Sequence, residues 1–251
     1  MARIQLGRGK VCGNEKKDAV TKTADGNVTP STIGALLHSP GRYDLFVWLA
    51  MLGREGVFRE KILRLARLQP GEAVLDVGCG TGTLAIAAKR QVGPTGLVHG
   101  IDASPEMLAR AEKKARKAGV EVVLKNAMAQ ALPFPDGQFD AVLNTIMLHH
   151  LPRKGRQQCA AEMRRVLKPG GRVLAVEFGL AAREQKGLLA HFHRHGYVKL
   201  PDMIGLLSEA GLNSVESGAV GIRDLQFVLA KVLPASDSRR ASSADRSHAR
   251  T

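Results

Sequence analysis

The chain has 251 residues, 44% of them hydrophobic, so it is long enough to bury one substantial core. Its three cysteines have no paired spacing, which excludes a disulfide framework, a zinc ribbon and a CxxC redox motif and favours a reducing cytoplasm. We expect no membrane span, because every apolar run is far shorter than the roughly 18 residues that cross a bilayer, and no secretion signal.

The formal charge of +14 would suit an anionic partner such as nucleic acid or a lipid surface. The excess is diffuse, with +3 in residues 1–30, +2 in residues 234–251 and the remaining +9 between them. Aromatic residues make up only 4%, which leaves few platforms for stacking bases. The composition therefore predicts a solvated basic surface and argues against a nucleic-acid partner.

The two ends lack an apolar period, and we expect disordered tails over residues 1–30 and 234–251. One domain is expected over residues 31–233. Its expected parts are N-terminal helices over 31–70, a ligand-binding core over 71–178, and a lid, a helix and a closing hairpin over 179–233.

Within this domain, short runs of Val, Leu and Ile alternate with helix-like stretches, which predicts an α/β, doubly wound fold with a mostly parallel sheet. The expected strands are Ala73–Val77, Leu97–Ile101, Val122–Leu124, Phe139–Asn144, Arg172–Phe178, Ser214–Val220 and Gln226–Val232, the last two forming an antiparallel hairpin. The expected helices are two within Tyr43–Leu68, one begun by Pro105 and ended by Gly119, and two over Lys154–Leu167 and Leu200–Ala210.

Local signals mark the ends of two of these helices. Ser104 can cap the helix that begins at Pro105, whose charges, Lys114 among them, fall largely toward solvent. A turn over residues 169–171, Pro-Gly-Gly, is expected to stop the helix before it and to lead into the fifth strand.

The most informative stretch is an apolar strand that ends near Asp76 and is followed by Gly78, Gly80 and Gly82. Glycines let the backbone turn sharply and let a ligand approach closely, and the helix that follows presents free N–H groups. The spacing is not the dinucleotide fingerprint, because the third glycine comes one residue early. An acid before the glycines favours a cationic ligand group.

Asp102 stands at the end of the second expected strand, 26 positions after Asp76. A carboxylate there can accept hydrogen bonds from both hydroxyls of a ribose. The alternative is that Asp102 only caps the helix that starts at Pro105.

Three further motifs follow in order: Leu-Pro-Phe at 132–134, Leu-His-His-Leu at 148–151 and Arg-Val-Leu-Lys-Pro-Gly-Gly at 165–171. With the glycine stretch, this order resembles the class I S-adenosylmethionine-dependent methyltransferases, and among them the ubiquinone and menaquinone C-methyltransferases. The resemblance covers about residues 43–232 and includes the Tyr43-Asp44 pair. It implies a seven-stranded, Rossmann-like sheet whose last strand is antiparallel, with S-adenosyl-L-methionine as cofactor across the ends of the first strands.

The resemblance also implies roles for individual residues. Asp76 and the three glycines would surround the methionine part of the cofactor, Asp102 its ribose, and the backbone near Asn144 its amino-acid end. One position departs from the family, where an Asp often accepts a hydrogen bond from adenine and this chain has Met128. Either adenine packs on Met128 and bonds the N–H of Ala129, or cofactor binding is weakened, since a thioether is a poor acceptor.

Methyl transfer needs a base only when the acceptor carries a proton of high pKa, as a phenol does. His150 is the first candidate for that base and His149 the second, although such a pair can also serve only packing and hydrogen bonding. Tyr43 either contacts the cofactor or acceptor or anchors its helix. Glu177 is either a further pocket residue or a strand-end carboxylate facing water.

His191, His193 and His195 alternate after the fifth strand, a spacing that could hold a metal on one face of an extended segment. No cysteine or acid alternates with them, so we expect no metal and interpret the segment as a lid over the acceptor.

The sequence thus predicts a cytoplasmic methyltransferase that transfers a methyl group by direct SN2 reaction to a small, apolar or aromatic acceptor. A quinone precursor, a phenol or a lipid headgroup would suit, and the basic surface could contact an anionic membrane. An RNA methyltransferase is an alternative, but the fourth strand ends Asn-Thr-Ile-Met at 144–147 and lacks the Asn/Asp-Pro-Pro-aromatic motif. A non-catalytic assembly or binding protein of this fold is another, supported only by Met128.

Overall fold

The computed structural model describes residues 55–179, 198–222 and 224–232, all within one compact unit, residues 33–251. Its helices are α2 (Glu55–Ala66), α3 (Thr83–Val92), α4 (Pro105–Ala118), the 3₁₀ turn η1 (Leu148–His150), α5 (Arg153–Val166) and α6 (Leu200–Glu209). Its strands are β1 (Ala73–Val77), β2 (Leu97–Asp102), β3 (Val123–Asn126), β4 (Phe139–Thr145), β5 (Leu167–Phe178), β6 (Asn213–Ala219) and β7 (Leu225–Lys231).

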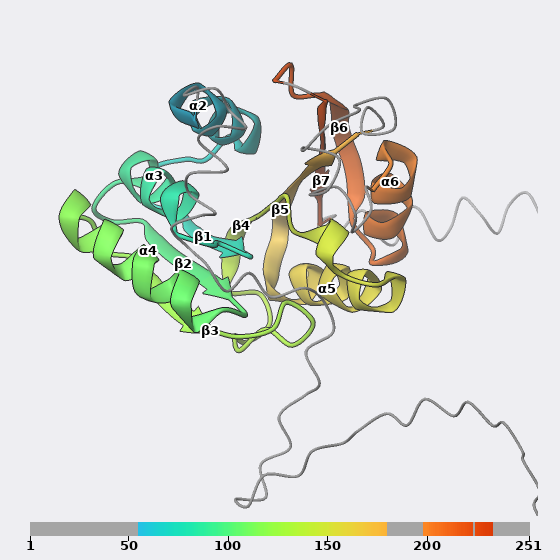
Figure 1. The fold of residues 1–251 in the computed structure, drawn as a ribbon. Helices are drawn as coiled ribbons and strands as arrows, with labels where there is room; N and C mark the ends of the chain where they lie inside the picture. Colours follow the sequence, from blue (N-terminus) through green and yellow to red (C-terminus); the bar gives the residue numbers. More distant parts are fainter. Residues whose placement is uncertain (1–54, 180–197, 223, 233–251) are drawn as a thin grey trace, which may run out of the picture. The chain divides into compact units, whose positions relative to one another are not determined.

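The strands form one seven-stranded sheet in the order β3-β2-β1-β4-β5-β7-β6 (Figure 1). The first five are parallel, and β7 runs antiparallel to both β5 and β6. The predicted doubly wound fold with an antiparallel last strand is confirmed. From β1 the chain first builds outward to β3 and then returns to place β4 on its other side, so the order reverses between β1 and β4. In open α/β sheets, ligands bind beyond the carboxyl ends of the strands at such a reversal.

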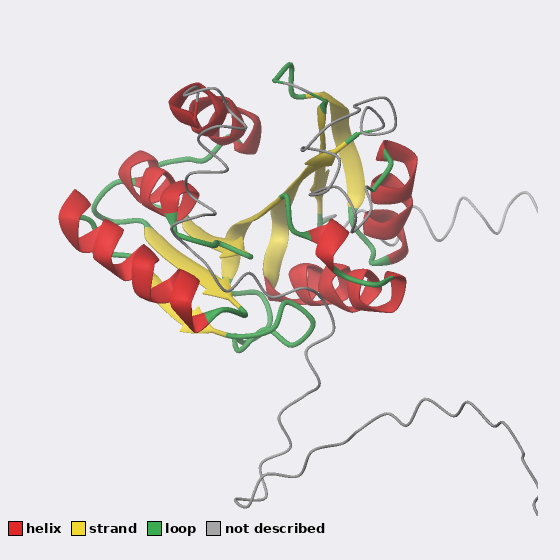
Figure 2. Ribbon diagram, in the orientation of Figure 1, coloured by secondary structure: helices red, strands yellow, loops and turns green. Residues whose placement is uncertain are grey.

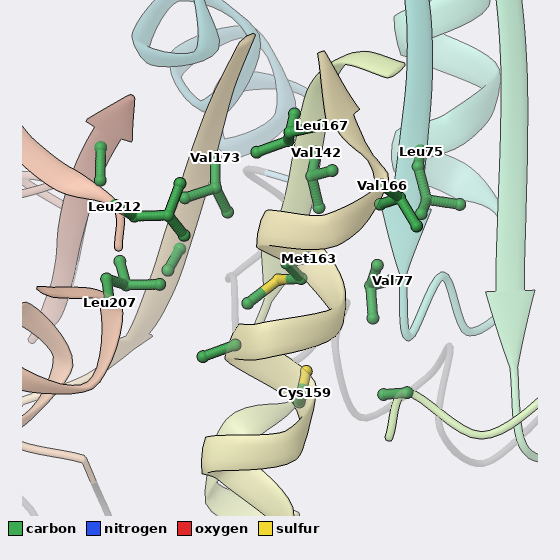
Figure 3. Close-up of a cluster of buried hydrophobic side chains, with 14 of the residues drawn as sticks. Leu75, Val77, Val142, Cys159, Met163, Val166, Leu167, Val173, Leu207 and Leu212 are labelled. Atoms are coloured by element: carbon green, nitrogen blue, oxygen red, sulfur yellow. The ribbon is translucent and has the colours of Figure 1, made fainter. Parts of the chain in front are cut away.

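Two apolar clusters fill the two faces of the sheet, and helices lie on both sides of it (Figure 2). Successive side chains of a strand point to opposite faces, so Val74 packs in the cluster that includes α2 and α3, whereas Leu75 packs in the cluster that includes α5 and α6. Figure 3 shows the second cluster, where Met163 of α5 lies among strand side chains and is fully buried. The central strands are therefore apolar on both faces, which explains why they appear in the sequence as continuous apolar runs.

The ends of α4 match the prediction. Ser104 Oγ accepts the N–H of Met107 at 3.2 Å, and Pro105 occupies the first turn. Gly119 ends the helix in the left-handed region, with φ of 64°.

Strand β5 begins earlier than predicted. Leu167 pairs with Phe139 and Arg172 with Ala141, so residues 168–171 bulge out of the ladder. The Pro-Gly-Gly turn is this bulge, with Gly170 at φ of 77°. The helix before it ends at Val166, and no separate loop divides helix from strand.

Several predicted features fall outside the described residues: the two tails, the first of the two helices within Tyr43–Leu68, and the lid. In the part of the chain that the structure describes, no helix is long and apolar enough to cross a membrane.

Candidate active site

The glycine loop joins β1 to α3 at the carboxyl edge of the sheet. Gly78, Gly80 and Gly82 all have positive φ, at 76°, 52° and 73°, a region that side chains with a Cβ seldom adopt. The N–H groups of Gly78 and Cys79 both donate to the carbonyl of Ile101 at 2.9 Å. The end of β2 therefore fixes the path of the loop.

Two of the glycines also make room for neighbouring elements. A Cβ on Gly78 would lie 2.6 Å from Cγ of Met147, which follows β4, and a Cβ on Gly82 would lie 2.7 Å from Cβ of Ala111 in α4. Both distances are too short for real contacts. These positions need glycine for packing as well as for backbone conformation.

Asp102 lies at the end of β2 and binds the same loop. Its Oδ2 accepts the N–H of Gly80 at 2.8 Å, and its Oδ1 accepts the N–H of Ser104 at 2.9 Å. Burial raises the pKa of Asp102, although its bonds to backbone N–H groups partly oppose the rise. Because Ser104 is the cap of α4, the idea that Asp102 only caps that helix is wrong.

Asp76 is a buried carboxyl group, 1% exposed, at the end of β1. Neither of its carboxylate oxygens has a hydrogen-bond partner within 3.5 Å among the residues the structure describes. Burial, followed by the negative charge of Asp102, raises the pKa of Asp76 to about 7, while the N–H of Ala85 opposes this. An uncompensated buried carboxylate is costly, and a cationic group bound beside it would supply the missing charge.

Lys114 of α4 is a residue that the sequence analysis missed. Its Nζ lies 2.7 Å from Oγ1 of Thr81 and 3.1 Å from Oγ1 of Thr83. The expectation that it points to solvent is wrong, because these hydroxyls draw the ammonium group in over the start of α3. The sequence held one signal for this: Lys114 comes three residues after Ala111, a small apolar residue that the structure shows buried on the inner face of α4.

Met128 and Ala129 follow β3 at the same edge of the sheet. Ala129 is buried and Met128 half-buried, and the carbonyl of Met128 accepts the N–H of Ala131 at 3.1 Å. The next segment is clamped to α5, since Glu162 Oε2 accepts the N–H of Leu132 at 2.7 Å and Arg165 donates to the carbonyl of Leu132 at 3.0 Å. Polar contacts from α5 thus fix the conformation of the segment that follows Met128 and Ala129.

Asn144, in β4, is fully buried. Its Nδ2 donates to the carbonyl of Val77 at 3.2 Å, which ties the ends of β4 and β1 together. Its Oδ1 makes no hydrogen bond to any of the described residues.

The turn after β4 brings His149 against Glu177 of β5. Nδ1 of His149 lies 2.8 Å from Oε2 of Glu177, which is fully buried, so the interpretation of Glu177 as a water-facing carboxylate is wrong. The rings of His149 and His150 stack with centroids 3.9 Å apart. The turn starts at Ile146 with φ of 54°, a strained value for a β-branched residue, and the N–H of Ile146 donates to the carbonyl of Val176 at 2.8 Å.

The remaining candidates are not placed. Tyr43, His191, His193 and His195 lie outside the described residues. Within the described ranges, no three His, Cys, Asp or Glu side chains form a group that could hold a metal ion.

Comparison with known proteins identifies the family. A model of the methyltransferase domain matches residues 74–171. Over 169 residues the chain is 38% identical to a demethylmenaquinone methyltransferase of Thermus thermophilus, a match that covers 66% of this chain and 74% of that relative. The chain belongs to the class I S-adenosylmethionine-dependent methyltransferases.

Two further matches agree with this family. The methyltransferase chain is 37% identical over 152 residues to the ubiquinone/menaquinone biosynthesis C-methyltransferase UbiE of Bordetella avium, covering 60% of this chain and only 59% of that relative. A crystal structure of a SAM-dependent methyltransferase from Aquifex aeolicus superposes with a TM-score of 0.66 at 25% identity, covering 78% of this chain and all of that one.

The cofactor of this methyltransferase family is S-adenosylmethionine, and the residues at the sheet edge fit it. Its sulfonium and ammonium groups are cationic, which matches the buried carboxylate of Asp76, whose charge no cation among the described residues compensates. Its ribose hydroxyls match the carboxylate of Asp102, whose two oxygens each hold only one of the hydrogen bonds given above and can accept more.

Proposed function

We propose that this methyltransferase acts on a ring carbon of a small aromatic acceptor of the hydroquinone class. The observation that carries the proposal is the 38% identity to a demethylmenaquinone methyltransferase over 74% of that enzyme's length. The C-methyltransferase UbiE supports the same acceptor class. Both relatives are named for quinone substrates, whereas neither is named for RNA or phospholipid.

We further propose which residues hold the cofactor. Asp76 faces its cationic groups, with Gly78 and Gly80 forming the adjacent backbone, and Asp102 accepts from the ribose. Asn144 supports this side of the proposed cofactor site by tying the end of β1 to β4. Gly82, the third glycine of the loop, also makes room for Ala111 of α4.

The adenine is proposed to lie against Met128 and to bond the N–H of Ala129. The clamp from Glu162 and Arg165 holds the segment that follows. Packing on a thioether gives this methyltransferase a contact that does not depend on charge.

When bound, the cofactor supplies a methyl group already activated by its sulfonium. The protein contributes positioning and the exclusion of water, which together account for much of the barrier reduction in such transfers. The site at the reversal of strand order suits this role, because the turn after β4 and the glycine loop meet there through Met147 and Gly78.

The proposal is tested by measuring methyl transfer from labelled S-adenosylmethionine to four acceptors: a short-chain demethylnaphthoquinol, a simple phenol, phosphatidylethanolamine vesicles and transfer RNA. We expect transfer to the quinol and a new carbon–methyl bond in its product. Transfer to phospholipid or RNA in place of the quinol would refute the acceptor class. Lack of cofactor binding in calorimetry would refute the catalytic function.

Contact of the basic surface with anionic membranes and a cytoplasmic location stay predictions. Sedimentation of the protein with vesicles that contain about 30% anionic lipid, at low and high salt, tests the first, because such attraction is screened by ions.

A further inference from the structure

The fully buried carboxylate of Glu177 holds one histidine of the 148–151 turn at two points. Its Oε2 lies 2.8 Å from Nδ1 of His149, and its Oε1 accepts the backbone N–H of the same residue at 3.4 Å. An ionised carboxylate can only accept hydrogen bonds, so the ring proton of neutral His149 belongs on Nδ1. The other ring nitrogen, Nε2, then carries a free lone pair.

This pair stands at the same edge of the sheet as the cofactor loop. Glu177 is at the carboxyl end of β5, and His149 follows β4, the strand beside β1. Met147, two residues before His149, packs directly on Gly78 of the glycine loop. The side chain of His149 keeps 11% of its surface exposed, whereas Glu177 keeps none.

We propose that His149 is the general base of the reaction and that Glu177 is the residue that positions it. This inference rests on the proposed function, since it assumes an acceptor with a hydroxyl proton. In the step, the O–H bond of the acceptor breaks and an H–Nε2 bond forms, and the electron pair stays on the acceptor and raises the electron density of its ring.

The rest of the reaction balances around this step. The ring carbon gains the methyl group, and the cofactor's sulfur keeps the electron pair of the broken carbon–sulfur bond. The methylated carbon then loses its own proton as the hydroxyl is re-formed. The imidazolium of His149 returns its proton to water, so one proton leaves in each turnover.

The geometry reverses the ranking made from the sequence, which placed His150 first. Among the residues that the structure describes, the charged and titratable groups found against His149 are Glu177 from β5 and His150 from its own turn, and Phe178 adds a ring contact at 6.0 Å. From α5, Arg156 donates to the carbonyls of Leu148 and Leu151, both at 2.9 Å, and holds the turn in place.

The first test reads the tautomer of His149 by ¹⁵N NMR of the ligand-free full chain at a pH where the ring is neutral. We expect the Nδ1–H form in the native protein and a shift of the population toward Nε2–H in Glu177→Leu, which has no acceptor. A native His149 protonated on Nε2 would overturn the inference. This readout needs no acceptor, so it is independent of whether the proposed function holds.

The second test is kinetic and uses the quinol acceptor. We expect His149→Asn to lower kcat about 100-fold or more with little change in cofactor affinity. Glu177→Gln should lower kcat less than His149→Asn does, because the amide oxygen can still accept the hydrogen bond from Nδ1–H. Glu112→Gln, which removes an exposed carboxylate on α4, is the matched control and should leave kcat unchanged.

Two results would overturn the assignment. One is a larger loss of kcat in His150→Asn than in His149→Asn. The other is a kcat in Glu177→Leu that matches the native one. A native protein that methylates no hydroquinone would instead refute the proposed function. The tautomer measurement would then still test whether Glu177 positions His149.

Discussion

Replacing Asp76 by Asn should stabilise the ligand-free protein at alkaline pH while removing its affinity for the cofactor. The carboxyl group of Asp76 is fully buried, and its pKa rises from 3.8 to about 7 because of burial and the nearby charge of Asp102. A group whose pKa is raised on folding favours the folded state only while it is protonated. The native protein therefore loses stability as pH rises from 3.8 to about 7, and the loss is complete above that range.

The size of the effect follows from the change in pKa. A rise of about 3 units, at about 1.36 kcal/mol per unit, corresponds to about 4 kcal/mol of unfolding free energy. Asn is neutral at every pH, so the advantage of Asp76→Asn over the native protein should approach this value at about pH 9 and fall to about 2 kcal/mol near pH 5.

Urea denaturation of both proteins at the two pH values measures this difference. Asp140→Asn is the control with the opposite sign, because burial is outweighed there by the ammonium group of Lys168 and the N–H of Ala73, and the pKa of Asp140 is lowered. That variant should be less stable than the native protein by a similar amount at both pH values, because a carboxyl group of lowered pKa stabilises the fold fully above its unfolded pKa of 3.8 and loses that contribution only below it. An equal advantage of Asp76→Asn at both pH values would refute the reasoning.

The same substitution has a consequence for binding. A cation beside Asp76 favours the ionised carboxyl group, so cofactor affinity of the native protein should increase as pH rises toward about 8. Calorimetry in two buffers of different ionisation enthalpy should show proton release on binding near neutral pH, and none from this group in Asp76→Asn.

Further predictions concern the cofactor site, the core and a half-buried histidine. Asp102→Ala should weaken cofactor binding at least about tenfold in calorimetry, because hydrogen bonds to a charged group contribute about 1.5–3 kcal/mol each. Met128→Asp should instead strengthen cofactor binding about 3- to 10-fold, because it adds one hydrogen-bond acceptor for the adenine. Met163→Ala should lower the unfolding free energy by about 2–5 kcal/mol, since the side chain is fully buried in the second cluster and its loss leaves a cavity. A loss below about 1 kcal/mol in urea denaturation would show that α5 shifts to fill the cavity. Burial and the charge of Lys125 lower the pKa of His99, so Tm should fall as pH drops below about 6.5, and His99→Phe should reduce that slope.

The parts of the fold that the sequence predicted well are those whose cause is local. Strand β1 has the predicted bounds because its apolar run is buried on both faces and ends in a glycine loop. The ends of α4 were predictable because a serine cap, a proline and a left-handed glycine each act within one turn. The match of motifs to a known family supplied the number of strands in the sheet and the antiparallel direction of the last one, whereas the strand order came only from the structure.

The details that the sequence did not predict depend on contacts between distant segments. The sequence left Glu177 open between a pocket residue and a water-facing strand end, and the structure places His149, 28 residues earlier, against its carboxylate. Lys114 looked solvated until α4 packed beside Thr81, 33 residues away. The early start of β5 depends on the pairing of Leu167 with Phe139 of the neighbouring strand β4. In each case the decisive partner is set by tertiary packing.

The contact between Met147 and Gly78 joins the turn after β4 to the glycine loop, the two segments that we propose to hold the acceptor and the cofactor. The turn that carries Met147 begins at the strained Ile146, and backbone strain of this kind persists only where surrounding contacts enforce it. A ligand that moves the turn must therefore change the surface that the glycine loop presents. Linkage then requires reciprocity: whatever factor an acceptor imposes on cofactor affinity, the cofactor imposes equally on acceptor affinity. Under the proposed function, Met147 is a contact through which we expect the affinities of the two substrates to be coupled.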